Sequence, residues 1–232
     1  MKTRFLLFAA VSALASLSSV RADSSLFLSD GIHNLTIVDG AANDSNPLVG
    51  VVTFNGLLDP NSPWTVNITT GISRPVLGNA NSPFLDLNSV NVSSSGGGTL
   101  FIEFSDTGFG PITAGTLTTE IGGSTGGSVA FRTWADSGNA LFGKTTTLAD
   151  LAFSSTPFSA AVLSERPNTN PFSLTLQTTI NHTGGEVTSF NGSLYDSSIR
   201  PSVPEPSSVS LIGLGLIGGL WVASRSRKKK AA

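Results

Sequence analysis

Residues 138–145 contain the residue types that most directly suggest chemistry, because they read GNALFGKT and fit the phosphate-binding pattern GxxxxGK[ST]. In such a loop, backbone N–H groups surround the phosphates and a long helix follows within a parallel sheet. Here Leu141 and Phe142 would crowd the loop, and only a short helical pattern follows at residues 147–153. We therefore expect no nucleotide partner. We interpret the segment as a surface connection whose Leu141 and Phe142 side chains pack into the core of a β-sandwich, the fold that the strand pattern described below predicts.

His33 and His182 are the two histidines of the sequence, which has no cysteine. Because they lack the spacings H-x-x-x-H and H-E-x-x-H, they predict no transition-metal site. His182 lies in the segment INHTGG at a predicted strand end, which favours a solvated histidine in a turn. A Ser-His-Asp triad stays open, since its members need not be adjacent in sequence. We expect a protein that is not an enzyme, with a secreted hydrolase as a remote alternative.

Acidic and aromatic residues offer two further binding chemistries. The acidic residues are scattered and never follow the EF-hand spacing D-x-[DN]-x-[DN]-G. Ca2+ could still bind where loops bring Asp side chains and backbone carbonyls together, so we keep Ca2+ open and expect no other cofactor. Trp64 and Trp134 are candidate sugar-stacking residues, although such rings more often fill the core of a sandwich.

The elements that would position these residues are short strands. Apolar and polar side chains alternate along the body, and Gly, Asn, Asp, Ser and Pro interrupt them, as is typical of antiparallel strands with one buried face. The predicted fold class is all-β, an antiparallel β-sandwich with a jelly-roll-like arrangement. The predicted strands are 26–29, 35–38, 48–57, 64–70, 84–92, 99–104, 116–121, 128–134, 160–163, 172–180 and 186–195.

Charge restricts the class of partner. From Asp23 to Arg200 the chain has fourteen Asp and Glu but only five Lys and Arg, so this part carries a net charge near −9. An acidic surface repels phosphate, so we expect no nucleic acid partner. Without cysteine, the domain must be stabilised by packing rather than by disulfides.

The N-terminal residues predict export. Lys2 and Arg4 precede an apolar stretch at residues 5–17, and Val20 and Ala22 stand at positions −3 and −1 if cleavage follows Ala22. A positive start, a short apolar region and a small residue at the cleavage point are typical of a secretory signal peptide. We predict a signal peptide at residues 1–22 and a β-sandwich domain at residues 23–196.

The C-terminal residues predict a membrane segment. Residues 209–224 are apolar and uncharged, and the fifteen residues from Val209 to Ala223 would form about 23 Å of helix. This is short for a hydrocarbon core of about 30 Å, so we predict one short transmembrane helix. A basic stop-transfer tail at residues 225–232 should lie in the cytoplasm and place the body across the membrane. Its basic residues are Arg225, Arg227, Lys228, Lys229 and Lys230.

A Pro-rich linker at residues 197–208 precedes this helix and contains Val203, Pro204, Glu205 and Pro206. The order of Pro-Glu-Pro, short apolar helix and basic end resembles the PEP-CTERM sorting signal of Gram-negative bacteria. The resemblance implies that exosortase, a membrane-embedded cysteine protease, recognises the motif and cuts near it. The helix would then be a transient anchor, and the mature protein would reach the cell surface or the exterior.

The resemblance also extends to the body, where residues 100–111 and 172–194 are similar to stretches of β-rich exported proteins that carry this signal. Many such carriers come from organisms that make exopolysaccharide and biofilm. We therefore expect a non-enzymatic role at the surface or in the extracellular matrix. The alternative is a carbohydrate-binding or adhesin module, with exopolysaccharide as the partner.

Six Asn-x-Ser/Thr sequons reflect a composition rich in Asn, Ser and Thr, and predict surface exposure of their asparagines. In a bacterium they predict no glycosylation of the eukaryotic type. They are Asn34, Asn43, Asn67, Asn91, Asn181 and Asn191.

Overall fold

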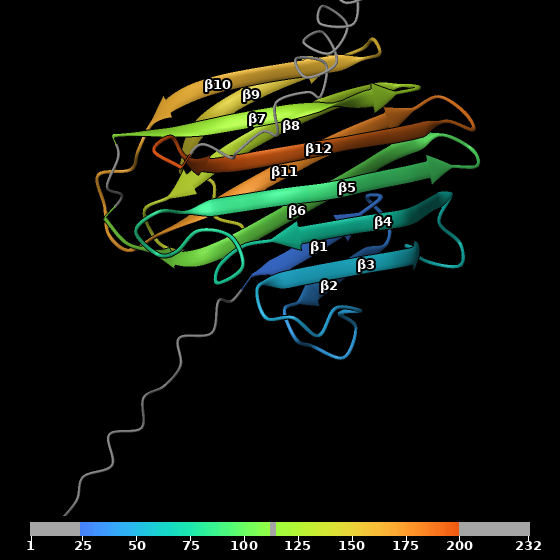
Figure 1. Ribbon diagram of the computed structural model, residues 1–232. Coiled ribbons are helices and arrows are strands. Elements are labelled where there is room, and N and C mark those ends of the chain that lie inside the picture. The colour runs from blue at the N-terminus through green and yellow to red at the C-terminus, as the bar shows by residue number, and fades with distance from the viewer. Residues whose placement is uncertain (1–23, 112–114, 200–232) are drawn as a thin grey trace, which may run out of the picture. The chain divides into compact units, whose positions relative to one another are not determined.

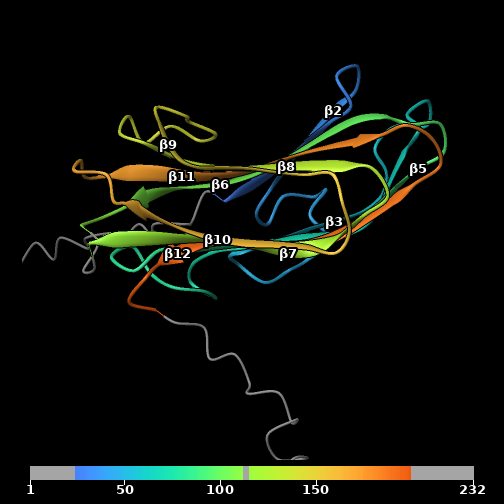
Figure 2. The ribbon, with the colours of Figure 1, turned by 90° about the horizontal axis from the view of Figure 1, so that it is seen from above.

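Two six-stranded antiparallel sheets pack face to face in the computed structural model, which describes residues 24–111 and 115–199 (Figures 1 and 2). The chain divides into two compact units, residues 1–199 and 200–232, and the second lies outside the described residues. None of the described residues is helical. The predicted all-β antiparallel sandwich is therefore confirmed.

The strand order is β2-β1-β6-β11-β8-β9 in the first sheet and β10-β7-β12-β5-β4-β3 in the second. From β5 onward the chain crosses repeatedly between the sheets, so that β5, β12, β7 and β10 face β6, β11, β8 and β9 (Figure 2). The strands are β1 (Ser25–Ser29), β2 (Asn34–Val38), β3 (Val51–Leu57), β4 (Trp64–Ile72), β5 (Phe84–Ser94), β6 (Gly98–Phe109), β7 (Thr116–Thr125), β8 (Ser128–Asp136), β9 (Thr146–Phe153), β10 (Phe158–Glu165), β11 (Phe172–His182) and β12 (Val187–Asp196).

Strand β5 shows how sequence alternation produces this packing. Its sequence, FLDLNSVNVSS, buries Leu85, Leu87, Val90 and Val92 completely and leaves the alternate polar residues on the outer face. Ser89, with a φ of 54°, adds one residue in the middle, so the alternation resumes correctly after it. Each fully buried aliphatic side chain contributes about 1.5–3 kcal/mol. The same alternation places polar side chains on the outer face.

Each of the eleven predicted strands overlaps a strand of the structure, but the predicted short helix at residues 147–153 is wrong. These residues form β9, which pairs with β8 along most of its length. Leu148, Leu151 and Ala152 have spacings that fit a helix, but two isolated turns gain little stability. Pairing with β8 satisfies the backbone instead, because it extends the first sheet by one strand.

The prediction of a solvated His182 is also wrong, because this side chain is only 4% exposed. Its ring lies 4.7 Å from the ring of the fully buried Trp64. Nδ1 is 2.8 Å from Ser94 Oγ, and Nε2 is 2.8 Å from Thr188 Oγ1. A strand end can therefore be buried when neighbouring strands supply polar partners, which local sequence does not reveal.

These hydrogen bonds determine the tautomer of His182. The Ser94 hydroxyl donates its proton to the Gly184 carbonyl, 2.7 Å away, so it accepts from His182 Nδ1. Nε2 then accepts from Thr188, and the ring is neutral. Burial lowers the pKa of His182 from its ordinary value of 6.5, although the Glu186 carboxylate acts in the opposite direction.

The close approach of the two sheets can be tested at Gly71 of β4. A Cβ atom there would lie 2.3 Å from the ring of Phe104, which is fully buried in the opposite sheet. We expect Gly71→Ala to reduce the free energy of unfolding by about 1–3 kcal/mol, measured by urea denaturation. Gly96→Ala is the control, since a Cβ there has no atom within 4 Å. Equal stability of both variants would contradict this account of the packing.

The buried His182 predicts a pH dependence of stability. Its folded pKa lies below the unfolded value of 6.5, so as pH falls below about 6.5 the unfolded state binds the proton first. The contribution of His182 to stability should therefore be constant above this pH and decrease below it, by at most about 1.4 kcal/mol per pH unit for one proton. The measurements are urea unfolding between pH 5 and 8 and an NMR titration of the ring.

His182→Gln should lack this decrease in stability. His33→Gln serves as the control, because the hydrogen bond that His33 donates to the Asp30 carboxylate raises the pKa of His33, and the contribution of His33 to stability falls as pH rises above 6.5. An NMR pKa of 6.5 or more for His182 would show that the imidazole is not buried as a neutral group.

Candidate functional site

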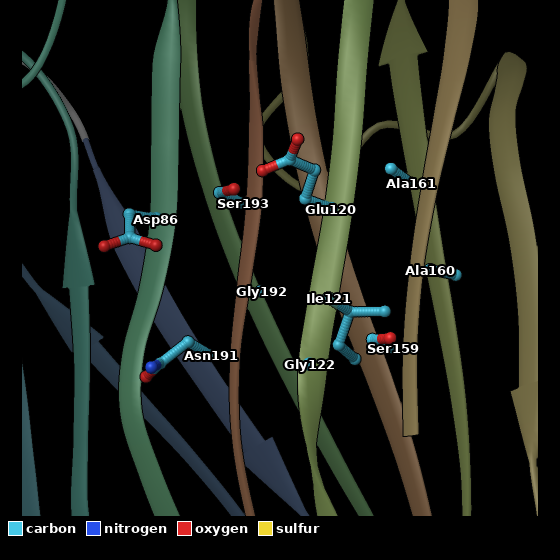
Figure 3. A pocket seen from close by; sticks show the side chains of 10 residues that line it. All are labelled: Asp86, Glu120, Ile121, Gly122, Ser159, Ala160, Ala161, Asn191, Gly192 and Ser193. Atoms are coloured by element: carbon cyan, nitrogen blue, oxygen red, sulfur yellow. The ribbon is translucent and has the colours of Figure 1, made fainter. Parts of the chain in front are cut away.

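The outer face of the second sheet has a polar hollow of about 520 Å³ over strands β10, β7, β12 and β5 (Figure 3). Strand register aligns the residues that line it. Ala161 is opposite Glu120, Glu120 is opposite Ser193, and Ser193 is opposite Asp86. Because paired residues in a sheet point to the same face, this row of side chains faces outward together.

Small residues make the surface concave. Ser159, Gly122 and Asn191 form a second row beside the first, and Gly122 has no side chain to fill the space. Gly192 of β12 faces the core, where a Cβ atom would lie 2.8 Å from the ring of Phe131. The chain between Asn191 and Ser193 thus lies close against the core.

The bulge at Ser89 orients the side chains of Asn191 and Asp86 in the hollow. The backbone N–H of Ser89 donates to Asn191 Oδ1 at 2.7 Å, which joins β5 to β12 where their register shifts. The Ser89 hydroxyl donates to Asn88 Oδ1 at 2.6 Å. Asn88 Nδ2 in turn donates to Asp86 Oδ2 at 3.3 Å. Two neighbouring polar side chains, Asn191 and Asp86, are therefore held by one hydrogen-bonded chain.

Two carboxylates lie on opposite sides of Ser193 in the hollow, Asp86 from β5 and Glu120 from β7 (Figure 3). Burial raises the pKa of Asp86, and the hydrogen bond from Asn88 acts in the opposite direction. Among residues 24–111 and 115–199, no Lys or Arg lies in the four strands that line the hollow. The hollow therefore offers carboxylate acceptors with hydroxyl and amide groups, a set suited to a neutral ligand rich in hydroxyl groups.

A second shallow hollow of about 490 Å³ continues this surface toward β4 and shares Asn191 with the first. Asn67 Nδ2 donates to Asn91 Oδ1 at 2.7 Å across β4 and β5. Three of the six sequon asparagines thus lie together in the structure. Asn91 in β5 and Asn191 in β12 alternate with buried residues, and this alternation is the sequence signal for the polar face. The second hollow is lined by Asn67, Ser89, Asn91, Ser189 and Asn191.

The two candidate sugar-stacking tryptophans lie elsewhere. Trp64 is completely buried and presents no ring face to solvent. Trp134 belongs to the first sheet and is 9% exposed, and Lys144 Nζ lies over its ring at 5.0 Å from the centroid. The structure brings neither ring to the hollow, whose lining residues apart from Ile121 are polar or small.

Residues 138–145 form a turn that folds over the outer face of the first sheet. Asp136 Oδ2 accepts the backbone N–H of Ala140 at 2.9 Å, and Ser105 Oγ accepts that of Phe142 at 3.0 Å. The ring of Phe142 lies 6.1 Å from that of Phe27 on this outer face, and not in the core as expected. Side chains of the protein itself thus occupy N–H groups that a phosphate would need.

Neither histidine has the environment of a catalytic triad. His33 Nδ1 is 2.9 Å from Asp30 Oδ2, and Nε2 is 3.5 Å from Asp59 Oδ1, so both ring nitrogens face carboxylates. Burial would raise the pKa of Asp30, but hydrogen bonds from His33 and its neighbours hold it well below the usual range. Ser124, in the sequence GGSTG that fits the spacing G-x-S-x-G, lies in β7 rather than in a strand-to-helix turn.

Within the described residues, no group of three His, Asp or Glu side chains converges on a common point. The same residues contain no helix with the length and hydropathy needed to cross a membrane. The segments predicted as signal peptide (1–22), linker beyond Ile199 (197–208), transmembrane helix (209–224) and basic tail (225–232) lie outside them, as do the sorting-motif residues.

Solved structures show only distant similarity. The K1 cleaved adhesin domain of Lys-gingipain from Porphyromonas gingivalis is 12% identical, with a TM-score of 0.36, over 67% of this chain and 95% of that one. A family 61 carbohydrate-binding module in complex with β-1,4-galactotriose is 10% identical, with a TM-score of 0.34, over 58% of this chain and 88% of that one. TM-scores this low carry no information about a ligand of this chain.

No curated protein sequence matches the chain. The C-terminal segment, in contrast, matches a family model described as the PEP-CTERM protein-sorting motif, over residues 202–228. These residues include Pro204, Glu205 and Pro206, the apolar stretch and most of the basic residues. The chain therefore carries a PEP-CTERM protein-sorting motif at its C-terminal end.

Proposed function

We propose that this protein is exported and sorted through its C-terminal motif, and that its sandwich acts without catalysis at the cell surface or in the extracellular matrix. The match of residues 202–228 to the sorting motif carries this proposal. Exosortase is the processing partner, and the apolar stretch at 209–224 anchors the chain until cleavage. An exopolysaccharide or biofilm matrix is the environment in which the mature protein acts.

The body does not depend on disulfide bonds for its stability, so export places no redox requirement on it. Its core is formed by packed aliphatic and aromatic residues of both sheets, and the chain has no cysteine, so folding needs no oxidation. The strand order β5-β12-β7-β10 facing β6-β11-β8-β9 supports a jelly-roll-like sandwich as the exported unit.

The sorting proposal predicts the effect of replacing the motif. With Pro204, Glu205 and Pro206 changed to alanine, we expect the cleaved form to disappear and the protein to stay in the membrane fraction. The readouts are the mature C-terminal residue, found by mass spectrometry, and the distribution of the protein between membrane and surface. Pro201→Ala, just outside the matched residues, is the control and should be processed normally. Unchanged cleavage of the triple variant would reject the proposal.

A second candidate function is carbohydrate binding in the hollow of the second sheet. The observation that favours it is the set of carboxylate, amide and hydroxyl groups around a concave surface formed by small residues. Sugar hydroxyl groups can both donate and accept hydrogen bonds, so they complement such a mixed set. Because Trp64 is buried and Lys144 lies over Trp134, we assign the contact to the polar residues of the hollow.

A glycan array tests this candidate. If the hollow binds sugar hydroxyl groups, Asp86→Asn and Glu120→Gln should each weaken binding about tenfold or more, since a hydrogen bond to a charged group contributes about 1.5–3 kcal/mol. Asp150→Asn, on the exposed outer face of the first sheet, is the matched control and should bind like the unaltered protein. A parallel array with a chelator shows whether Ca2+ takes part. Absence of binding to every glycan would refute this function.

A further inference from the structure

Strand β10 is an edge strand with little of the usual protection against pairing. It lies at the end of the second sheet (Figure 1) and pairs with β7 over eight consecutive residues without a register shift. Its sequence, FSAAVLSE, has no Lys or Pro, and Leu163 is 69% exposed. Long, regular and apolar edges tend to pair with another strand.

The other three sheet edges of the described fold differ from β10. Strand β2 has only five residues. Strand β3 is interrupted by a register shift between Phe54 and Gly56. The register between β9 and its neighbour β8 shifts between Thr133 and Trp134 of β8. Asp150 of β9 also forms an ion pair with Arg132 at 2.8 Å. Short length, bulges and charges all hinder edge pairing, so β10 stands out as the edge suited to it.

The backbone of β10 has hydrogen-bonding groups directed away from the sheet. Arg166, which follows the strand, donates its N–H to Gly115 O at 3.4 Å. In an antiparallel ladder every second residue bonds the same neighbour, so the even-numbered residues of β10 bond β7. The N–H and C=O groups of Ser159, Ala161 and Leu163 therefore point toward the free edge.

We propose that β10 pairs antiparallel with β10 of a second copy of this chain, about a two-fold axis, so that the second sheet continues across the dimer. The distribution of charge supports this partner. Glu165 is the single charged residue of β10 and lies at its end. Antiparallel pairing places the two Glu165 residues at opposite ends, whereas parallel pairing would set like charges side by side.

The pleat of the strand restricts the register. Side chains alternate between the two faces of the sheet, so odd-numbered residues of β10 face one side and even-numbered residues the other. Paired residues face the same side, so an odd-numbered residue must lie opposite an odd-numbered one, and an even-numbered residue opposite an even-numbered one. Maximal overlap then places either Ala161 opposite Ala161 or Val162 opposite Val162. The exposed Leu163 would lie opposite Ser159 in the first register and opposite Ala161 in the second, against a small side chain in both. The exposed apolar surface of Leu163 is thus covered by the pairing.

Single-cysteine variants of the full chain test the dimer directly, because the sequence has no cysteine of its own. At the two-fold axis, the Cα atoms of identical residues would be about 4.5–5.5 Å apart, which suits a disulfide. We expect Ala161→Cys or Val162→Cys, after mild oxidation of whole membranes, to give a disulfide-linked dimer on a non-reducing gel. The variant that links more strongly identifies the register.

Two matched variants make this test specific. Val38→Cys, at an exposed position on the edge strand β2, should remain monomeric under the same oxidation. Leu163→Lys, added to the cross-linking variant, should decrease the dimer band several-fold, since a charge on the edge of both copies opposes pairing. The proposal is wrong if neither β10 cysteine links, if Val38→Cys links equally, or if Leu163→Lys has no effect.

Discussion

The close approach of the two sheets is the constraint on which the rest of the structure depends. Aromatic rings of the first sheet press against glycines of the second, Phe104 on Gly71 and Phe131 on Gly192. No side chain fits at either glycine without displacing a ring. Because Gly192 lies between Asn191 and Ser193, the same contact that closes the core also sets the depth of the polar hollow on the opposite face of β12.

Much of the fold could be predicted from the sequence, because apolar and polar residues alternate along a strand that has one buried face. Strand β5 is an example, with four buried aliphatic residues between polar ones. At residues 147–153 the spacing of apolar residues fits both a short helix and a strand. Pairing with β8 decides in favour of the strand. His182 was misjudged for a related reason, since Ser94 and Thr188, its hydrogen-bonding partners, lie on other strands.

The candidate site was harder to predict than the fold. Asp86, Glu120 and Ser193 lie on three strands, and only the strand order β7-β12-β5 makes them neighbours. Their grouping depends on register, which no local pattern specifies. The sequons at Asn67, Asn91 and Asn191 indicated a polar face, but their meeting in one hollow follows from the topology. The sorting motif, in contrast, is a contiguous segment and could be recognised directly.

The position of β12 has a mechanical consequence. The chain leaves the described fold from this strand, which lies between β5 and β7 and pairs with both along most of its length. A pulling force applied through the C-terminal residues would therefore load a central strand, and hydrogen bonds on both of its sides would have to break before it left the sheet. An edge strand at this point would have hydrogen bonds to break on one side alone. The topology thus suits a domain that stays folded under tension while one end of its chain is held.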